Sequence, residues 1–282
     1  MRLEDLLETT TYTQVAGGFQ FTEGPVWHRE GYLLFSDIPA SIIYRYAPGS
    51  DAAPVSWRQP SGSSNGLTFD RSGRLLACEH GNRRVSRTEA DGTVTPLASH
   101  YDGARLNSPN DIVVRSDGSV YFTDPPYGIS EKERELPHNG LYRIAPDGAL
   151  HLLETDFGRP NGLAFSPDES LLYVDDSPRR EIRVFGVNSQ GQLTSDRLFA
   201  TLESPEEGSP DGMKLDVAGN IYCTGPGGIW IYEPTGTLVG IAAGPERPAN
   251  LAFGDADLHT LYITARTGLY SLRTQYPGLP VF

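Results

Sequence analysis

GRPNGLAFSPDESLLYVDD, the stretch from Gly158 to Asp176, reads as a strand, a Pro-Asp turn and a second strand. Apolar and small residues before the turn and the run LLYV after it are typical of a β-hairpin. The first strand opens on the amide side chain of Asn161, followed at once by a glycine. A hairpin has no need of a polar side chain at this point, so the position is a candidate for binding a ligand.

The same hairpin recurs along the whole chain. The six units are EGPVWHREGYLLFSD from Glu23, NGLTFDRSGRLLACE from Asn65, NDIVVRSDGSVYFTD from Asn110, NGLAFSPDESLLYVDD from Asn161, DGMKLDVAGNIYCTG from Asp211 and NLAFGDADLHTLYIT from Asn250. Each unit begins with an amide or carboxylate residue, called the anchor below, and two further strands follow in most units. Four strands in roughly 45 residues, repeated six times, predict an all-β, six-bladed β-propeller with four-stranded antiparallel blades.

The two ends of the chain indicate how the ring closes. The last unit supplies three strands, NLAFGD, TLYITAR and GLYSLRT, and lacks a fourth. The segment TYTQVAGG, Thr11–Gly18, precedes the first unit and belongs to none. Because an open ring leaves sheet edges unpaired, we expect this N-terminal strand to complete the sixth blade. The prediction is one propeller domain over residues 1–282; a solenoid is the alternative, although solenoid repeats are usually shorter and need not close.

The anchors predict a metal site. In a propeller the first strand of each blade lines the central channel, so equivalent positions of all blades meet at one end of it. The predicted ring consists of Glu23, Asn65, Asn110, Asn161, Asp211 and Asn250. Crowded carboxylates need a neutralising charge, and an oxygen-only ligand set suits Ca²⁺ best, with Mg²⁺ or Mn²⁺ as alternatives. Any single anchor can instead be a turn residue that binds backbone groups, and Asn65 and Asn250 are the weakest members.

Further acidic residues end the second strands of the hairpins and return to the same face. They are Asp37, Glu79, Asp124, Asp175 and Asp176. For all of these except Asp124, we expect turn residues with solvated carboxylates rather than ligands. Asp124 is a candidate for binding substrate.

Composition and charge restrict the partners. The chain has 282 residues and a formal net charge of -13, which argues against nucleic acid and anionic membranes as partners, since both require a positive surface. The stretch MRLEDLLETTTYTQ contains no apolar core of signal-peptide length, and no apolar run of membrane-spanning length occurs in the sequence, so we expect a cytoplasmic protein. Cys78 and Cys223 lie in strand-like runs and are expected to be buried, reduced thiols. The oligomeric state is not predicted.

The motifs EGPVW, SPNDIVV, GSVYFTDPPYG, RPNGLAFSPD and SPDGMKLD resemble, in the same order, those of the senescence-marker-protein/gluconolactonase family, which includes regucalcin-like and sugar-lactone lactonase proteins. The resemblance implies a six-bladed propeller with one divalent metal ion, often Ca²⁺; for this chain we expect Ca²⁺, with Zn²⁺, Mg²⁺ or Mn²⁺ as alternatives. It also implies that Glu23, Asn161 and Asp211 are metal ligands. Asn110 corresponds to a position that binds the metal or the substrate, and Asp211 to the general base.

The expected reaction is hydrolysis of a gluconolactone-like sugar lactone to the aldonic acid, with the cation polarising the carbonyl and a carboxylate activating water. Asp211 is the first choice for this base, with Asp111 or Asp124 as substitutes. The alternatives are a metal-dependent esterase that hydrolyses organophosphates or non-sugar lactones, and a propeller that only binds a partner.

Specificity is expected in the loops above the metal. The segment Pro125–Gly140 is the longest and most polar insertion and a candidate lid or pocket wall. Candidate substrate-binding residues are Asn110, Arg105, Asp124, Tyr127 and Trp27, with His80 and Arg159 as further possibilities. Arg105 is the only arginine close upstream of Asn110, whereas animal members of the family have a substrate-contacting arginine nearer to it.

Overall fold

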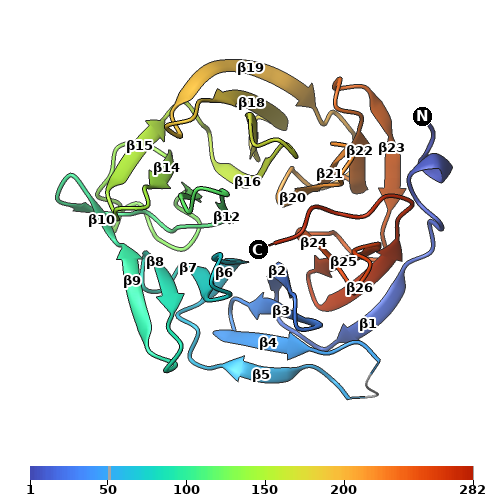
Figure 1. The fold of residues 1–282 in the computed structure, drawn as a ribbon, viewed down its shortest axis with the longest axis horizontal. Helices are drawn as coiled ribbons and strands as arrows, with labels where there is room; N and C mark the ends of the chain where they lie inside the picture. The colour runs from blue at the N-terminus through green and yellow to red at the C-terminus, as the bar shows by residue number, and fades with distance from the viewer. Residues whose placement is uncertain (50–51, 282) are drawn as a thin grey trace.

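Six antiparallel sheets of four strands each form a ring around a central channel in the computed structural model, which describes residues 1–49 and 52–281 (Figure 1). The predicted six-bladed β-propeller is therefore confirmed. In every sheet the strand nearest the channel belongs to an anchor-containing hairpin (Figure 1).

The blades follow one another along the chain. Blade 1 contains β2 (Thr22–His28), β3 (Tyr32–Asp37), β4 (Ile42–Tyr46) and β5 (Val55–Arg58), and blade 2 contains β6 (Ser64–Phe69), β7 (Leu75–Glu79), β8 (Arg84–Thr88) and β9 (Val94–Ala98). Blade 3 contains β12 (Ile112–Val114), β13 (Val120–Asp124), β14 (Gly140–Ile144) and β15 (Leu150–Glu154). Blade 4 contains β16 (Pro160–Phe165), β17 (Leu171–Asp176), β18 (Glu181–Val187) and β19 (Leu193–Thr201).

The remaining elements complete the ring. Blade 5 contains β20 (Met213–Leu215), β21 (Ile221–Gly225), β22 (Gly228–Tyr232) and β23 (Leu238–Ala243), and blade 6 contains β24 (Asn250–Gly254), β25 (Thr260–Ala265), β26 (Gly268–Arg273) and β1 (Thr13–Gly17). A short hairpin of β10 (His100–Tyr101) and β11 (Ala104–Arg105) leads into blade 3. The start of the chain forms only one 3₁₀ turn, η1 (Leu3–Asp5).

Blade 6 closes the ring as the sequence predicted. Strand β1 pairs antiparallel with β26, from Thr13 opposite Ser271 to Gly17 opposite Gly268. The outermost strand of this blade therefore comes from the opposite end of the chain, and no other blade is built this way (Figure 1). Pairing the two ends removes the exposed edge that an incomplete blade would leave.

Apolar side chains fill the space between neighbouring blades. Six buried clusters lie one at each blade–blade contact; for example, Tyr121, Phe165 and Phe185 pack between blades 3 and 4. The two inner strands of each blade are almost wholly buried, whereas outer strands such as β5 are largely exposed. Packing between blades thus holds the inner strands in fixed positions around the channel. Cys78 and Cys223 are free and buried in these layers, as expected.

The glycines that follow four of the anchors allow the inner strands to approach closely. A Cβ added to Gly24 would lie 1.9 Å from the backbone oxygen of Asn65, and one added to Gly162 would lie 2.3 Å from the backbone oxygen of Asp211. Gly24 also has a φ of +50°, which side chains disfavour. The anchor–glycine pair therefore serves packing: each glycine lets its strand contact the anchor of the next blade.

The C-terminal tail enters the middle of the ring (Figure 1). It lies at the end of the channel away from the anchors. Gly278 bridges to Asp216, and the amide nitrogen of Leu279 donates to the carbonyl of Leu215. Leu279 and Val281 thereby cover one mouth of the channel. Within the described residues there is no helix of the length and apolar character needed to cross a membrane.

Candidate active site

Five of the six anchors line one cavity of about 470 Å³ at one end of the channel. They enter at the start of the inner strands: Glu23, Asn65 and Asn161 are each the second residue of their strand. Asn110 and Asp211 each stand two residues before theirs. The ring predicted from the repeat is thus brought together by the fold.

The sixth anchor, Asn250, lies below the cavity instead of lining it. Its Nδ2 donates to Oδ2 of Asp111 at 3.4 Å, and Nζ of Lys214 donates to its Oδ1 at 3.5 Å. The side chain of Asn250 also hydrogen-bonds the carboxyl group of Glu23. Asn250 therefore supports the cavity floor and links it to the only lysine that enters the channel among the described residues.

A chain of amide hydrogen bonds crosses the floor. Nδ2 of Asn65 donates to Oδ1 of Asn110 at 2.6 Å, and Nδ2 of Asn110 donates to Oδ1 of Asn161. Asn161 then donates to Oγ of Ser177 at 3.2 Å, and this hydroxyl donates to the carbonyl of Pro210 at 2.8 Å. Because every amide is held by its neighbour, the side chains are fixed in direction before any ligand arrives.

Two carboxyl groups share the floor. The side chains of Glu23 and Asp211 hydrogen-bond each other, and Asp211 also bonds Asn161. Burial and then the neighbouring Asp211 and Asp111 raise the pKa of Glu23 well above its usual value. Burial is likewise the main cause that raises the pKa of Asp211 to about 7, against the opposing influence of Arg247. Without a cation, one proton is therefore shared between the two acids.

The donor set fits a hard divalent cation. Glu23 and Asp211 supply carboxylate oxygens to the cavity, and Asn110 and Asn161 supply amide oxygens. A divalent ion would replace the shared proton and allow both carboxylates to ionise. Among residues 1–49 and 52–281, no three His, Cys, Asp or Glu side chains are grouped to hold one ion, so a cation in this cavity would also need the amide oxygens as ligands.

His80 lies beside the amide chain, with Nε2 3.2 Å from Oδ1 of Asn110 and 3.4 Å from Nδ2 of Asn65. Burial lowers the pKa of His80 to about 4. The imidazole is therefore neutral near pH 7 and adds no positive charge to the floor.

The cavity mouth is more polar and more exposed. Tyr127 comes from the long connection between β13 and β14 and is 40% exposed. The guanidinium of Arg159 lies 5.4 Å from the centroid of its ring. Arg247 lines the same cavity and donates to Oγ of Ser209 at 3.3 Å. Of the insertion Pro125–Gly140, Tyr127 is the residue that forms part of the cavity wall.

The acids that end the second strands are buried, so the expectation of solvated carboxylates was wrong. Asp37, Glu79, Asp175 and Asp176 are each at most 2% exposed. Asp37 accepts from the amide nitrogens of Gln20 and Phe21, and Asp176 from those of Gly158 and Arg159. These carboxylates fix the loops that precede the anchors, while Glu79 binds Arg58 and Arg84.

Three candidate substrate-binding residues do not line the cavity. Trp27 stands four residues after Glu23 on β2, borders the opposite cavity and stacks on Tyr262 with ring centroids 5.9 Å apart. Since a strand rises about 3.3 Å per residue, it lies roughly 13 Å farther along the channel. The fold therefore gives Trp27 a place in the core between blades 1 and 6.

Asp124 and Arg105 are also placed elsewhere. Asp124 is fully buried, and its Oδ2 accepts from the backbone nitrogen of Asn107 at 2.7 Å, so it orders the loop before Asn110. Arg105 lies in the β10–β11 hairpin, where its guanidinium donates to the carbonyl of Asn82 at 3.2 Å. Neither borders the space above the anchors.

Ser177 and Arg247 are among the cavity residues that were not predicted from the sequence. Ser177 follows β17, and its Oγ accepts the hydrogen bond from Asn161 that ends the row of amides across the floor. Arg247 precedes Asn250 in RPAN, as Arg159 precedes Asn161 in RPN. This shared Arg-Pro step before an anchor was the available signal for Arg247.

Known proteins are similar to this chain in both sequence and fold. The family model described as the SMP-30/gluconolactonase/LRE-like region matches residues 21–267. The chain is 37% identical to the gluconolactonase of Zymomonas mobilis, over 98% of this chain and 85% of that protein. The solved structure of a gluconolactonase from Xanthomonas campestris superposes with a TM-score of 0.87 at 33% identity, covering 96% of this chain and 92% of that one.

A more distant structure shares the fold. The calcium-binding regucalcin from Agrobacterium tumefaciens has a TM-score of 0.78 at 18% identity, covering 98% of this chain and 96% of that one.

Proposed function

Because the chain belongs to the SMP-30/gluconolactonase/LRE-like family, we propose that it is a lactonase that hydrolyses a sugar lactone to the open-chain aldonic acid. Water adds to the lactone carbonyl carbon, the bond from that carbon to the ring oxygen breaks, and the proton removed from water is returned to the ring oxygen. The observation that carries the proposal is the convergence of Glu23, Asn110, Asn161 and Asp211 on one cavity.

We infer that these four residues hold one divalent cation, Ca²⁺ by the preference of an oxygen-only donor set. Such an ion, when bound, polarises the lactone carbonyl and lowers the pKa of a coordinated water. The calcium-binding relative supports this inference. The hydrogen-bonded amides keep the donors in place, and the inter-blade packing keeps them at fixed separation.

Asp211 is the proposed general base. Its carboxyl group faces the cavity, so it can accept a proton from a water molecule placed beside the lactone carbonyl. The two substitutes considered from the sequence, Asp111 and Asp124, do not border the cavity. Asp111 instead accepts the backbone nitrogen of Ile112 through Oδ1 at 2.9 Å.

The upper wall positions the substrate. Tyr127, Arg159 and Ser177 surround the space above the anchors. A sugar lactone presents hydroxyl groups that these side chains can bind, while the apolar face of the sugar ring can lie against the tyrosine. Asn110 is proposed to contact the substrate as well as the cation.

The test is a panel of lactones followed by pH-stat titration of the acid released. Turnover of aldonolactones that is lost with a chelator and restored by Ca²⁺ supports the proposal. Turnover only of phosphotriesters or of non-sugar lactones would assign the same ring to the alternative esterase activity. No turnover of any ester, together with an absence of bound cation after addition of Ca²⁺, would contradict both.

A further inference from the structure

Two arginines, Arg159 and Arg247, lie at the mouth of the cavity, whereas the acidic residues that line it lie on its floor. Arg159 precedes β16 and Arg247 precedes β24, so they come from blades 4 and 6, on either side of the blade that supplies Asp211. Both are exposed to solvent and both line the cavity. They face a space whose floor carries the carboxyl groups of Glu23 and Asp211.

Neutral partners hold both guanidinium groups. Arg159 lies over the ring of Tyr127, and Arg247 bonds the hydroxyl of Ser209. In the part of the chain that the structure describes, neither has a carboxylate within ion-pair distance. Other arginines differ: Arg84 binds Glu79 at 2.7 Å, and Arg74 binds Asp70 at 2.8 Å. Neither mouth arginine is therefore paired directly with a carboxylate, although Arg247 acts on Asp211 and lowers the pKa of that carboxyl group.

The cavity is less acidic than the chain as a whole. The chain has a net charge of -13, which repels anions in general. Arg159 and Arg247 offset the two floor carboxylates, and a bound divalent cation would make the cavity positive overall. A neutral lactone needs no such excess charge, whereas an anionic one needs it to enter a strongly acidic protein.

We propose that Arg159 and Arg247 form an anion subsite, and that the preferred substrate is a lactone with an anionic substituent, such as a phosphate, sulfonate or carboxylate group, away from the lactone carbonyl. The inference rests on the proposed lactonase function. A cavity of about 470 Å³ lies in the range that accommodates small-molecule ligands. Guanidinium groups bind planar and tetrahedral oxyanions through paired N–H donors.

The competing role for the two arginines is to bind the carboxylate of the product or the oxyanion that precedes it. These groups form from every lactone, whether the substrate is neutral or charged. The two roles therefore differ in one measurable quantity: the ratio of kcat/KM for an anionic lactone to kcat/KM for the matching neutral lactone.

The experiment compares D-gluconolactone with its 6-phosphate, its 6-sulfonate analogue and a lactone that carries a carboxylate at carbon 6, in the presence of Ca²⁺. The variants are Arg159→Gln and Arg247→Gln. Arg197→Gln is the matched control, because Arg197 is exposed on the outer strand β19. We expect the wild-type ratio to exceed one for at least one anion. Each mouth variant should lower that ratio at least about tenfold, or about 1.4 kcal/mol, and the control should leave it unchanged.

Equal losses on neutral and anionic lactones would overturn the subsite and assign the arginines to the common carboxylate. A wild-type ratio below one for all three anions would also overturn it. Calorimetric binding of 6-phosphogluconate against gluconate keeps the test independent of turnover, and tighter binding of the phosphate that is lost in both variants is expected. Absence of hydrolysis of every lactone would contradict the proposed function, while this binding difference would still report on the subsite.

Discussion

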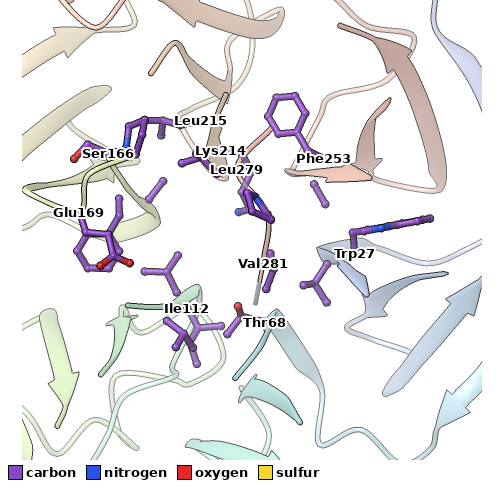
Figure 2. Close-up of a pocket in the computed structure, with 18 of the residues that line it drawn as sticks. Trp27, Thr68, Ile112, Ser166, Glu169, Lys214, Leu215, Phe253, Leu279 and Val281 are labelled. Carbon is purple, nitrogen blue, oxygen red and sulfur yellow. The ribbon is translucent and has the colours of Figure 1, made fainter. Parts of the chain in front are cut away.

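The two ends of the propeller channel are built from the same six inner strands and have opposite chemistry. At one end, anchors such as Glu23 and Asp211 line a cavity of about 470 Å³. At the other, apolar side chains such as Ile112 and Phe253 surround a slightly larger cavity of about 510 Å³ around Leu279 and Val281 (Figure 2).

Position along the strand decides which end a residue serves. Strand β2 gives Glu23 to the polar cavity and Trp27 to the wall of the apolar one. Lys214 stands between the two, since it lines the apolar cavity (Figure 2) and its Nζ donates to Oδ1 of Asn250 under the polar floor. The carboxylates that border the apolar cavity, Asp168 and Glu169, accept hydrogen bonds from neighbouring serines, so the lining and not the volume identifies the reactive end of the channel.

The largest expected effect comes from the polar end. Asp211→Asn keeps the shape of the side chain but removes a ligand charge and the proposed base, so kcat/KM for the lactone should fall at least about 10³-fold. The matched change at the other end, Val281→Ala, should leave kcat/KM within about twofold of wild type. Steady-state kinetics on both variants measures the contrast, with thermal unfolding as the check that each is folded. Comparable losses at the two ends would break the comparison.

Removal of the cation is the second test. Because the ion is expected to bind only the folded ring, Ca²⁺ at 100 times its dissociation constant should add about 2.7 kcal/mol to the free energy of unfolding. Calorimetric unfolding with chelator and with Ca²⁺ measures the difference. Asp211→Asn should reduce this stabilisation, whereas Val281→Ala should keep it. A melting temperature that is the same with and without Ca²⁺ would argue against a cation in the ring.

Asp124 and Asp211 sharpen the comparison, because burial raises the pKa of both to about 7 and only Asp211 faces the cavity. The pKa of an aspartate in the unfolded chain is about 4. Below that pH, a carboxyl group whose pKa is raised in the folded state contributes its full stabilisation, and this contribution is lost as the pH rises through about 7. Between pH 4 and 8, Asp124→Asn should therefore gain stability relative to wild type, by up to about 4 kcal/mol.

Urea unfolding of the Asp124→Asn variant and of wild type at several pH values measures this gain. A stability difference that does not change with pH would show that Asp124 is ionised in the folded protein throughout the range.

The smallest expected effect is at the apolar mouth. Leu279→Ala removes a partly buried side chain and should cost about 1–2 kcal/mol of unfolding free energy, with kcat/KM close to wild type. Denaturant titration and lactone kinetics on the same preparation separate the two quantities. A large loss of turnover would mean that the tail is coupled to the anchors, with Lys214 and Asn250 as the connecting pair.

The fold and the anchors were predictable because they repeat. A single Asn161 is ambiguous, but six equivalent residues separated by four-strand units imply a ring. The missing fourth strand of the last unit implied that the segment Thr11–Gly18 closes it, and β1 within this segment does so. Residues outside the repeat were harder to place. Arg247 and Ser177 lie in loops, and their position depends on how the blades pack rather than on any pattern within a strand.

The misplaced residues failed for physical reasons that the sequence does not show. Trp27 shares a strand with Glu23, but the strand runs along the channel and places the indole at the opposite end. Asp124 was a candidate for binding substrate, yet its Oδ2 accepts a hydrogen bond from the backbone nitrogen of Asn107. The buried Asp37 and Asp176 likewise accept backbone hydrogen bonds from the loops before other anchors. An acid at a strand end can therefore hold an anchor in place without contacting the ligand.

The most direct measurement is a crystal structure of the protein grown with Ca²⁺, repeated with Mn²⁺ for its anomalous signal. We expect one ion in the channel, bound by oxygen atoms of Glu23, Asn110, Asn161 and Asp211, and no ion among the apolar side chains around Leu279. An ion bound elsewhere, or an empty ring in a protein that still hydrolyses lactones in the presence of a chelator, would contradict the central claim that these anchors form a metal-dependent active site.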